Sequence, residues 1–142
     1  MERCTIIAVN DEDDWELMEA GEALFDASGI NLGRNEPITH VCVEGDVVLA
    51  ALASSLAIEG DPPTSTFSVA VSPTARRAGI ARKLIAEYMD DVRAQVSEYG
   101  APGLELVAWV VNPHMVPLLE RLGFDSDCAE WSPDCPHFRR WL

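Results

Sequence analysis

Residues 69–85 read VAVSPTARRAGIARKLI, and this stretch decides the fold. A short apolar run is broken by Ser72-Pro73, then arginines and Gly79 open a long amphipathic segment. An exposed helix start presents backbone N–H groups and the positive end of the helix dipole to phosphate oxygens, and glycine allows close approach. Four of the ten Lys and Arg residues fall within eight positions here: Arg76, Arg77, Arg82 and Lys83. The stretch therefore predicts a strand, a loop and a helix start that hold an anion.

The length and the composition predict one globular domain over residues 1–142. A chain of 142 residues with 48% hydrophobic residues can bury roughly two-thirds of its unfolded surface. No apolar run approaches the roughly 18 residues that a membrane span needs, and Met1-Glu2-Arg3-Cys4 does not lead into a signal peptide. We therefore expect a cytoplasmic protein with no membrane partner.

The charge is strongly acidic and uneven along the chain. The net charge is −14, and residues 1–63 hold fourteen acids against Arg3 and Arg34, a local balance of −12. Such a surface repels nucleic-acid phosphate and anionic lipid, so neither is expected as a partner. It attracts a cationic or amine-bearing partner. The alternative is that the acidic excess serves solubility alone.

Hydrophobic periodicity and turn residues predict alternating strands and helices. We expect a strand at 3–9, then a helix capped by Asn10 that ends near Gly29, with acids 11–14 in its first turn and Trp15, Leu17, Met18, Leu24 and Phe25 on its buried side. A hairpin at 39–44 and 47–58 turns at Gly45-Asp46, and strands follow at 64–71 and 104–111, the latter central. Between these two strands a helix begins near Arg77 and ends at Tyr99-Gly100. Its buried side is formed by Ile80, Leu84, Ile85, Tyr88, Val92 and Val96. A short helix at 112–123 and two short strands after it complete an α/β domain.

The cysteines and the aromatic tail suggest structural roles. Four scattered cysteines in a cytoplasmic protein are expected to be reduced thiols. The Cys128-x6-Cys135-x-His137 spacing matches no common zinc pattern, so no metal site is expected. Trp131, Phe138 and Trp141 are expected to pack against the sheet; as an exposed set they would instead form a contact in a homodimer.

Two motifs resemble those of the GNAT superfamily of acyl-CoA-dependent N-acyltransferases. Residues 71–81 resemble its motif A, [QR]-x-x-G-x-[GA], with Arg76, Gly79 and Ala81 at the defined positions. Asn112, Met115 and the run Leu119-Glu120-Arg121-Leu122-Gly123-Phe124 resemble the second signature, an Asn followed by Tyr-E-[KR]-L-G-F. The resemblance implies the GNAT fold, a mixed and mostly antiparallel sheet with helices on both faces, and acetyl-CoA as co-substrate.

The resemblance also implies which residues hold the coenzyme. The pantetheine arm would lie where the strand at 69–71 splays from the strand at 106–110, beside Asn112, and backbone N–H groups from Arg77 to Arg82 would hold the pyrophosphate. The implied set is Val69, Ala70, Val71, Arg76, Arg77, Ala78, Gly79, Ile80, Ala81, Arg82, Asn112 and Leu119. The alternatives are a solvated helix start for the arginines and simple helix capping for Asn112.

The sequence departs from the family at the positions expected to move protons. Leu119 replaces the Tyr that commonly protonates the leaving thiolate, and the strand at 64–71 has no carboxylate to serve as base. Glu105, His114 and His40 are candidate substitutes acting through water, each with an ordinary structural role as the alternative. Pro117 would either reshape the acyl pocket or lie within the first helical turn, which tolerates it.

Two functions therefore follow from the sequence. The first is an acetyl-CoA-dependent N-acetyltransferase that acts on a primary amine of a small molecule or a peptide. The alternative is a catalytically degenerate GNAT-fold domain that binds coenzyme A or serves a structural role in a larger assembly.

Overall fold

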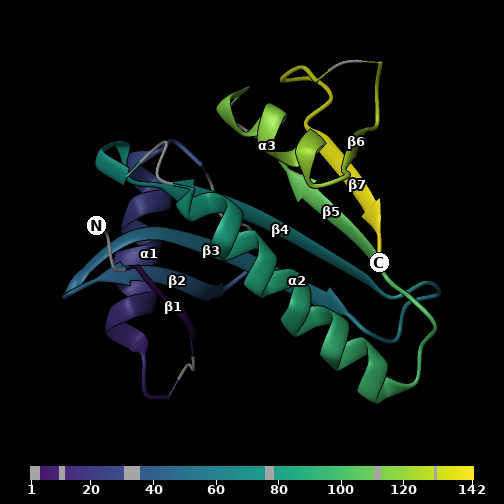
Figure 1. The fold of residues 1–142 in the computed structure, drawn as a ribbon, viewed down its shortest axis with the longest axis horizontal. Helices are drawn as coiled ribbons and strands as arrows, with labels where there is room; N and C mark the ends of the chain where they lie inside the picture. The colour runs from purple at the N-terminus through teal and green to yellow at the C-terminus, as the bar shows by residue number, and fades with distance from the viewer. Residues whose placement is uncertain (1–3, 10–11, 31–35, 76–78, 111–112, 130) are drawn as a thin grey trace. The chain divides into compact units, whose positions relative to one another are not determined.

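The computed structural model describes residues 4–9, 12–30, 36–75, 79–110, 113–129 and 131–142. Three α-helices, two short 3-10 helices and seven strands make up this part of the chain (Figure 1). In chain order they are β1 (Thr5–Ala8), α1 (Trp15–Ala27), β2 (Ile38–Glu44), β3 (Val47–Ala57), β4 (Thr64–Val71), η1 (Pro73–Ala75), α2 (Ile80–Tyr99), β5 (Glu105–Trp109), η2 (Pro113–Met115), α3 (Val116–Arg121), β6 (Asp125–Ser126) and β7 (His137–Trp141). No helix in the described ranges has the length and apolar character to span a membrane.

The seven strands form one sheet in the order β1-β2-β3-β4-β5-β7-β6. The β4–β5 pairing is parallel, and the β1–β2, β2–β3, β5–β7 and β6–β7 pairings are antiparallel. This confirms a mixed, mostly antiparallel sheet with β5 in its interior. Residue contacts divide the chain into two compact units, Met1–Ser54 with Val69–Asp90 and Ser55–Ser68 with Asp91–Leu142.

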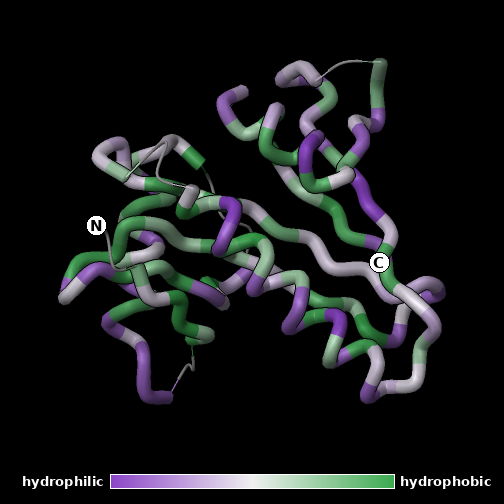
Figure 2. Tube along the Cα trace, in the orientation of Figure 1, coloured by the Kyte–Doolittle hydropathy of each residue, from purple (hydrophilic) through white to green (hydrophobic). Residues whose placement is uncertain are grey.

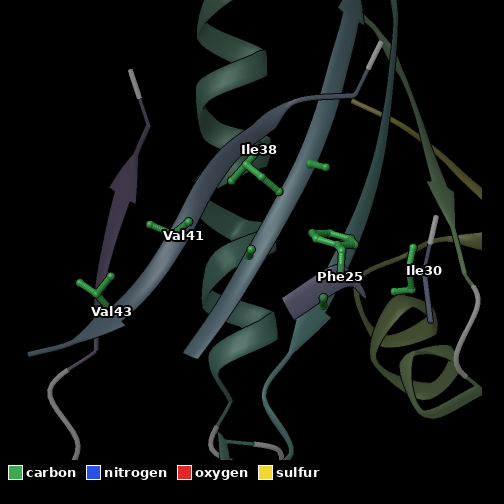
Figure 3. Close-up of a cluster of buried hydrophobic side chains, with 8 residues drawn as sticks. Phe25, Ile30, Ile38, Val41 and Val43 are labelled. Atoms are coloured by element: carbon green, nitrogen blue, oxygen red, sulfur yellow. The ribbon is translucent and has the colours of Figure 1, made fainter. Parts of the chain in front are cut away.

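In the first unit, α1 packs on one face of the β2–β3 hairpin. A Cβ added at Gly21 would lie 3.1 Å from Ala51 Cβ and from Ile38 Cγ2, so the helix backbone lies directly on the strands. The helix Phe25 is fully buried in this layer. Figure 3 shows this cluster, whose buried members are Phe25, Ile30, Ile38, Val41, Val43, Ala51, Ala53 and Ala70.

The helix α2 packs on the opposite face of the same strands. An irregularity between Ile38 and His40 shifts the register, so that Ile38 pairs with Ala53 and His40 with Leu52. The two side chains therefore face opposite sides, and the His40 ring meets the Tyr88 ring of α2 edge-on, with centroids 6.0 Å apart. Hydrophilic and hydrophobic residues alternate along α2 in Figure 2. All six residues predicted for its buried side are buried, which confirms the helical pattern.

In the second unit, β5 lies between β4 and β7. The parallel ladder runs from Thr64 opposite Glu105 to Phe67 opposite Ala108, and β4 continues to Val71 after this last pair. Phe67 and Phe138 flank Ala108 on one buried face, and Phe124 meets Phe67 edge-on with ring centroids 5.8 Å apart. Figure 1 shows α3 beside β5, β6 and β7.

Some helix boundaries differ from the prediction. The helix α1 begins at Trp15, after Asp14, so the acids before it do not form its first turn; Asn10 and Asp11 lie outside the described residues. Trp15 is 59% exposed, which makes its predicted burial wrong. It lies beside the stripe of residues at spacings of three and four that runs back from Phe25. The predicted last helix is η2 followed by α3, with Pro117 in the first turn of α3, where it is tolerated.

Candidate functional site

The end of β4 leads into a short, hydrogen-bonded connection in the first unit. The Ser72 N–H donates to the Leu49 carbonyl over 2.8 Å, which holds the end of β4 against β3. The Ala75 N–H then donates to the Ser72 carbonyl over 2.9 Å, and the Ser72 and Thr74 hydroxyls lie 3.0 Å apart. These bonds fix the path of the chain as it leaves the sheet.

Gly79 stands at the start of α2 in the left-handed backbone region. Its φ is 73°, and no heavy atom of the described residues, apart from its chain neighbours, lies within 4 Å of an added Cβ. The Lys83 N–H donates to the Gly79 carbonyl over 3.2 Å. The first turn of α2 also carries the N–H groups of Ile80, Ala81 and Arg82. No carbonyl within the helix lies four residues before them, so their acceptors must come from outside the helix. An open backbone and first-turn amides together suit a phosphate ligand.

The side chains around this helix start point in different directions. Ile80 is buried against the core, whereas Arg82 and Lys83 are exposed. On β4, Ala70 belongs to the cluster around Phe25, and its neighbours Val69 and Val71 are partly exposed. The remaining candidates, Arg76, Arg77, Ala78 and Asn112, lie outside the described residues. The first unit thus contains Val69–Val71 and residues 79–82 of the predicted set.

Leu119 lies in the second unit, on α3, and is 1% exposed. Its carbonyl accepts a hydrogen bond from the Phe124 N–H over 2.9 Å, which closes the helix end at Gly123, where φ is 87°. A buried leucine has no proton to donate. In the structure Leu119 packs in the core and closes the helix end, and its implied contact with the coenzyme stays a prediction.

Glu105 begins β5 and takes part in a surface ion-pair network. Its Oε1 lies 2.8 Å from Arg139 Nη1, and Arg139 Nε lies 2.8 Å from Asp127 Oδ1. Glu105 also pairs with Thr64, the first residue of β4, seven residues before Val71. Its role as a base stays a prediction, and its position at the start of both strands does not favour it.

The two candidate histidines differ in their surroundings. His114 lies on η2 and is exposed. His40 is only 6% exposed; its Nδ1 lies 3.0 Å from Thr39 Oγ1, which lies 2.7 Å from Ser54 Oγ. A histidine held in this way beneath α2 suits a structural role, whereas His114 is open to solvent.

The cysteine prediction is wrong for one pair. Cys128 and Cys135 form a disulfide across the connection between β6 and β7, while Cys4 and Cys42 are not disulfide-bonded. The antiparallel pairing of β6 with β7 brings the two ends of the connection together, which the spacing alone did not indicate. Among the described residues, no His, Cys, Asp or Glu group is arranged to hold a metal ion.

The tail aromatics pack only in part as predicted. Phe138 is buried, and the Trp131 Nε1–H donates to the Val110 carbonyl over 3.0 Å. Trp141 is 60% exposed, so its predicted packing is wrong. Trp109, which no sequence pattern singled out, is 48% exposed and meets the His137 ring edge-on, with centroids 4.9 Å apart. The exposure of Trp109 was not predicted because the rest of its strand is mostly apolar. Alternation along β5 places Trp109 on the same face as Glu105.

The model of the acetyltransferase (GNAT) family matches residues 3–124. The chain belongs to this family. No curated protein matches the sequence at a significant level.

Several solved structures share the GNAT fold of this chain. A mutant AtaT toxin bound to the C-terminus of the antitoxin AtaR and acetyl-CoA is 19% identical, with a TM-score of 0.66 over 96% of this chain and 92% of that chain. The NatC complex bound to Gag peptide and CoA is 18% identical, with a TM-score of 0.67 over 100% and 98%. An aminoglycoside acetyltransferase from an uncultured soil metagenomic sample is 15% identical, with a TM-score of 0.64 over 91% and 94%. At these identities the likeness establishes the fold alone.

Proposed function

We propose that this GNAT protein transfers an acetyl group from acetyl-CoA to a primary amine of a small molecule or a peptide. The observation that carries the proposal is the left-handed Gly79 at the start of α2, directly after the connection that leaves β4. Similar folds were solved with acetyl-CoA or CoA bound, in the AtaT and NatC structures. Membership of the family and this helix start together support acetyl-CoA as co-substrate.

The coenzyme would be held mainly by backbone groups of the first unit. The N–H groups of residues 79–82 would bind its pyrophosphate, with Arg82 supplying positive charge, and the main chain of Val69–Val71 would bind its pantetheine. Arg76, Arg77, Ala78 and Asn112 join this set by their positions in the family motifs. The open space at Gly79 fits close approach of a phosphate to the backbone.

The transfer step requires a neutral amine and a leaving thiol. The amine nitrogen attacks the thioester carbonyl carbon, the carbon–sulfur bond breaks, and the proton lost by the amine balances the proton gained by the thiolate. Leu119 cannot supply that second proton. Since an ordinary thiol has a pKa near 8.5, the thiolate leaves readily, and orientation of the two reactants supplies much of the rate. His114, exposed at η2, is the candidate to take the amine proton through water.

Isothermal titration calorimetry with acetyl-CoA tests the binding half of the proposal. Two unit charges about 4 Å apart in water interact by about 1 kcal/mol. Arg82→Glu replaces an attraction to the pyrophosphate by a repulsion of the same size. The complex with acetyl-CoA should therefore be roughly thirtyfold weaker. Glutamate suits the first turn of a helix, so the fold is preserved. The matched control is Arg93→Glu, an exposed charge reversal eleven residues further along α2. Absence of binding at millimolar acetyl-CoA, or equal losses in both variants, contradicts the proposal.

The second candidate function is a GNAT-fold domain that binds coenzyme A without transferring an acetyl group. Buried Leu119 and the engagement of Glu105 with Arg139 favour it. Release of free thiol from acetyl-CoA, measured across a panel of primary amines, separates the two. Binding without turnover on the whole panel supports the degenerate domain. The cytoplasmic location, the single domain and the homodimer stay predictions under either function.

A further inference from the structure

A disulfide closes the connection between β6 and β7 in the second unit. The ladder of these two strands continues to the Asp127 N–H, which donates to the His137 carbonyl over 3.1 Å. Cys128 and Cys135 lie just beyond this bond, with their Cα atoms 6.4 Å apart. The disulfide therefore joins the two ends of the connection where the ladder gives way to the loop.

The ring that the disulfide closes carries Trp131, which reaches the end of β5. Its Nε1–H donates over 3.0 Å to the carbonyl of Val110, 21 residues earlier in the chain. The Val110 N–H donates over 2.9 Å to the carbonyl of Pro136, the residue after Cys135. Val110 directly follows β5 and is buried. The connection thus binds the end of β5 through both the N–H and the carbonyl of Val110.

The hydrogen bonds of the two cysteine backbones join residues that are close in the sequence. The Cys128 N–H donates to Ser126 Oγ over 3.2 Å, and the Cys135 N–H donates to the Ser132 carbonyl over 2.9 Å. These bonds shape each end of the connection and do not tie one end to the other. In the described part of the ring, residues 128, 129 and 131–135, the disulfide is what joins the two ends.

The disulfide is open to attack by a thiol. Cys128 is exposed, whereas Cys135 is half-buried. Thiol–disulfide exchange needs access to a sulfur atom, and exposed disulfides are the labile or regulatory ones. The sequence predicts a cytoplasmic protein, and disulfides in the cytoplasm are typically transient and redox-sensing. Exposure and the predicted location therefore both favour reversible reduction over a permanent crosslink.

We propose that the Cys128–Cys135 disulfide is a redox switch that holds Trp131 against the end of β5 when it is oxidised. The reductant is a low-molecular-weight thiol. Its thiolate attacks Cys128 Sγ, the bond between the two cysteine sulfurs breaks, and Cys135 leaves as a thiolate that takes up a proton. A second thiolate attacks the reductant sulfur of the mixed disulfide, and Cys128 leaves and is protonated in the same way. Two electrons have then passed to the cysteines, and the reductant departs as its own disulfide.

Reduction changes the balance between the Trp131 hydrogen bond and the freedom of the loop. The opened ring regains conformational entropy, which the bond from the indole to Val110 must then overcome. In the reduced protein the indole therefore leaves Val110, and the bond between Val110 and Pro136 opens more often. The other end of the β5–β7 ladder is held independently, because Leu104 and Leu142 exchange two backbone hydrogen bonds of 3.2 and 2.9 Å.

NMR of the full chain with and without dithiothreitol tests the switch. On reduction, the indole N–H signal of Trp131 should move towards that of Trp15, whose side chain is 59% exposed. The Val110 amide should exchange with solvent about ten- to sixtyfold faster, the upper value being the chain entropy of a ring of this size. The Leu104 amide is the matched control and should keep its rate. Equal acceleration of both amides, or an unchanged Trp131 signal, overturns the proposal.

Trp131→Phe tests whether the disulfide acts through the indole hydrogen bond. This variant keeps the ring and removes the Nε1–H. The Val110 amide should exchange faster in the oxidised variant than in the oxidised wild type, and reduction should then accelerate it less than in the wild type. If the substitution and the reduction acted independently, their two factors would multiply. Multiplied factors therefore contradict the proposal.

The redox step is tested with millimolar reduced glutathione, followed by alkylation and mass spectrometry. Cys128 and Cys135 should become alkylated, and oxidised glutathione should restore the disulfide and the original NMR signals. A disulfide that stays intact in reduced glutathione is a permanent crosslink and overturns the proposal. Cys128→Ser with Cys135→Ser should show the reduced signals without dithiothreitol; since it retains Cys4 and Cys42, a remaining response to dithiothreitol would assign the change to those thiols instead. Acetyl-CoA enters none of these measurements, so they do not depend on the proposed function.

Discussion

Replacing Gly79 with alanine tests whether the left-handed backbone at the start of α2 matters for binding. Gly79 has a φ of 73°, and within the described ranges no heavy atom beyond its chain neighbours lies within 4 Å of an added Cβ. The substitution therefore introduces no clash with these residues. Its cost is the strain of a non-glycine residue in this backbone region, about 1–2 kcal/mol.

That strain is expressed either in stability or in affinity. If the backbone keeps its conformation, the free energy of unfolding falls by about 1–2 kcal/mol and Tm falls by about 3–8 °C. If the backbone relaxes instead, stability is preserved and acetyl-CoA must restore the left-handed form. Its Kd then rises about 5- to 30-fold. The losses in unfolding and binding free energy should together amount to at least about 1–2 kcal/mol, because the added Cβ also occupies part of the space through which the phosphate is proposed to approach the backbone.

Gly29→Ala is the matched control, since Gly29 has a φ of 74° and equally open surroundings at the end of α1. It should lose similar stability and keep its affinity for acetyl-CoA. Urea unfolding gives the free energy of unfolding of each variant, and calorimetry gives the Kd of each variant for acetyl-CoA. The reasoning is refuted if Gly79→Ala changes neither quantity, or if Gly29→Ala weakens acetyl-CoA binding as much.

Three further predictions concern stability. Burial raises the pKa of the Glu36 carboxyl, so its stabilising contribution is present below the pKa of the unfolded chain and is lost as pH rises through the folded value. Glu36→Gln should therefore raise Tm at pH 7, and this gain in Tm should vanish near pH 4. Glu59→Gln, at an exposed turn, should not raise Tm. Equal Tm values for Glu36→Gln and the wild type at pH 7 would contradict this. A Cβ at Gly21 would already lie 3.1 Å from side-chain atoms of β2 and β3. Gly21→Leu should therefore lower the free energy of unfolding, measured in urea, by about 1–3 kcal/mol through overpacking. An unchanged free energy of unfolding would contradict this and mean that the strands can move away from the helix. Replacing Cys128 and Cys135 by serine opens a ring with a sequence separation of 7 and should cost about 2–3 kcal/mol; the wild type in dithiothreitol should match the variant, and a variant as stable as the oxidised protein would refute the estimate.

Local chemistry made much of the fold predictable. The hairpin turns at Gly45, whose φ of 61° only glycine adopts readily, and β4 has the predicted bounds. The periodicity of α2 named its buried residues correctly because one helical face packs on the sheet. The burial of Trp15 was predicted wrongly because apolar character alone does not say on which side of α1 a residue lies, and Trp15 lies beside the stripe that runs back from Phe25.

The site was less predictable, since it depends on contacts between distant residues. The Cys128–Cys135 disulfide follows from the pairing of β6 with β7, which the sequence spacing does not encode. The exposure of Trp109 and Trp141 depends on which face of the ladder is covered, a tertiary property. Glu105 seemed available as a base in sequence, but Arg139, 34 residues further on, binds it.

Binding and transfer make different demands, and the residues proposed for binding lie in another unit than Leu119, which the family resemblance links to proton transfer. The proposed pyrophosphate site, at Gly79 and the first turn of α2, lies in the first unit and needs only backbone amides and positive charge. Leu119, in the second unit, contributes no proton, so acid catalysis at that position cannot raise the rate of transfer. A readily leaving thiolate makes this loss tolerable, provided that the amine is well oriented. The residues that orient the acceptor then determine whether this GNAT protein is an enzyme.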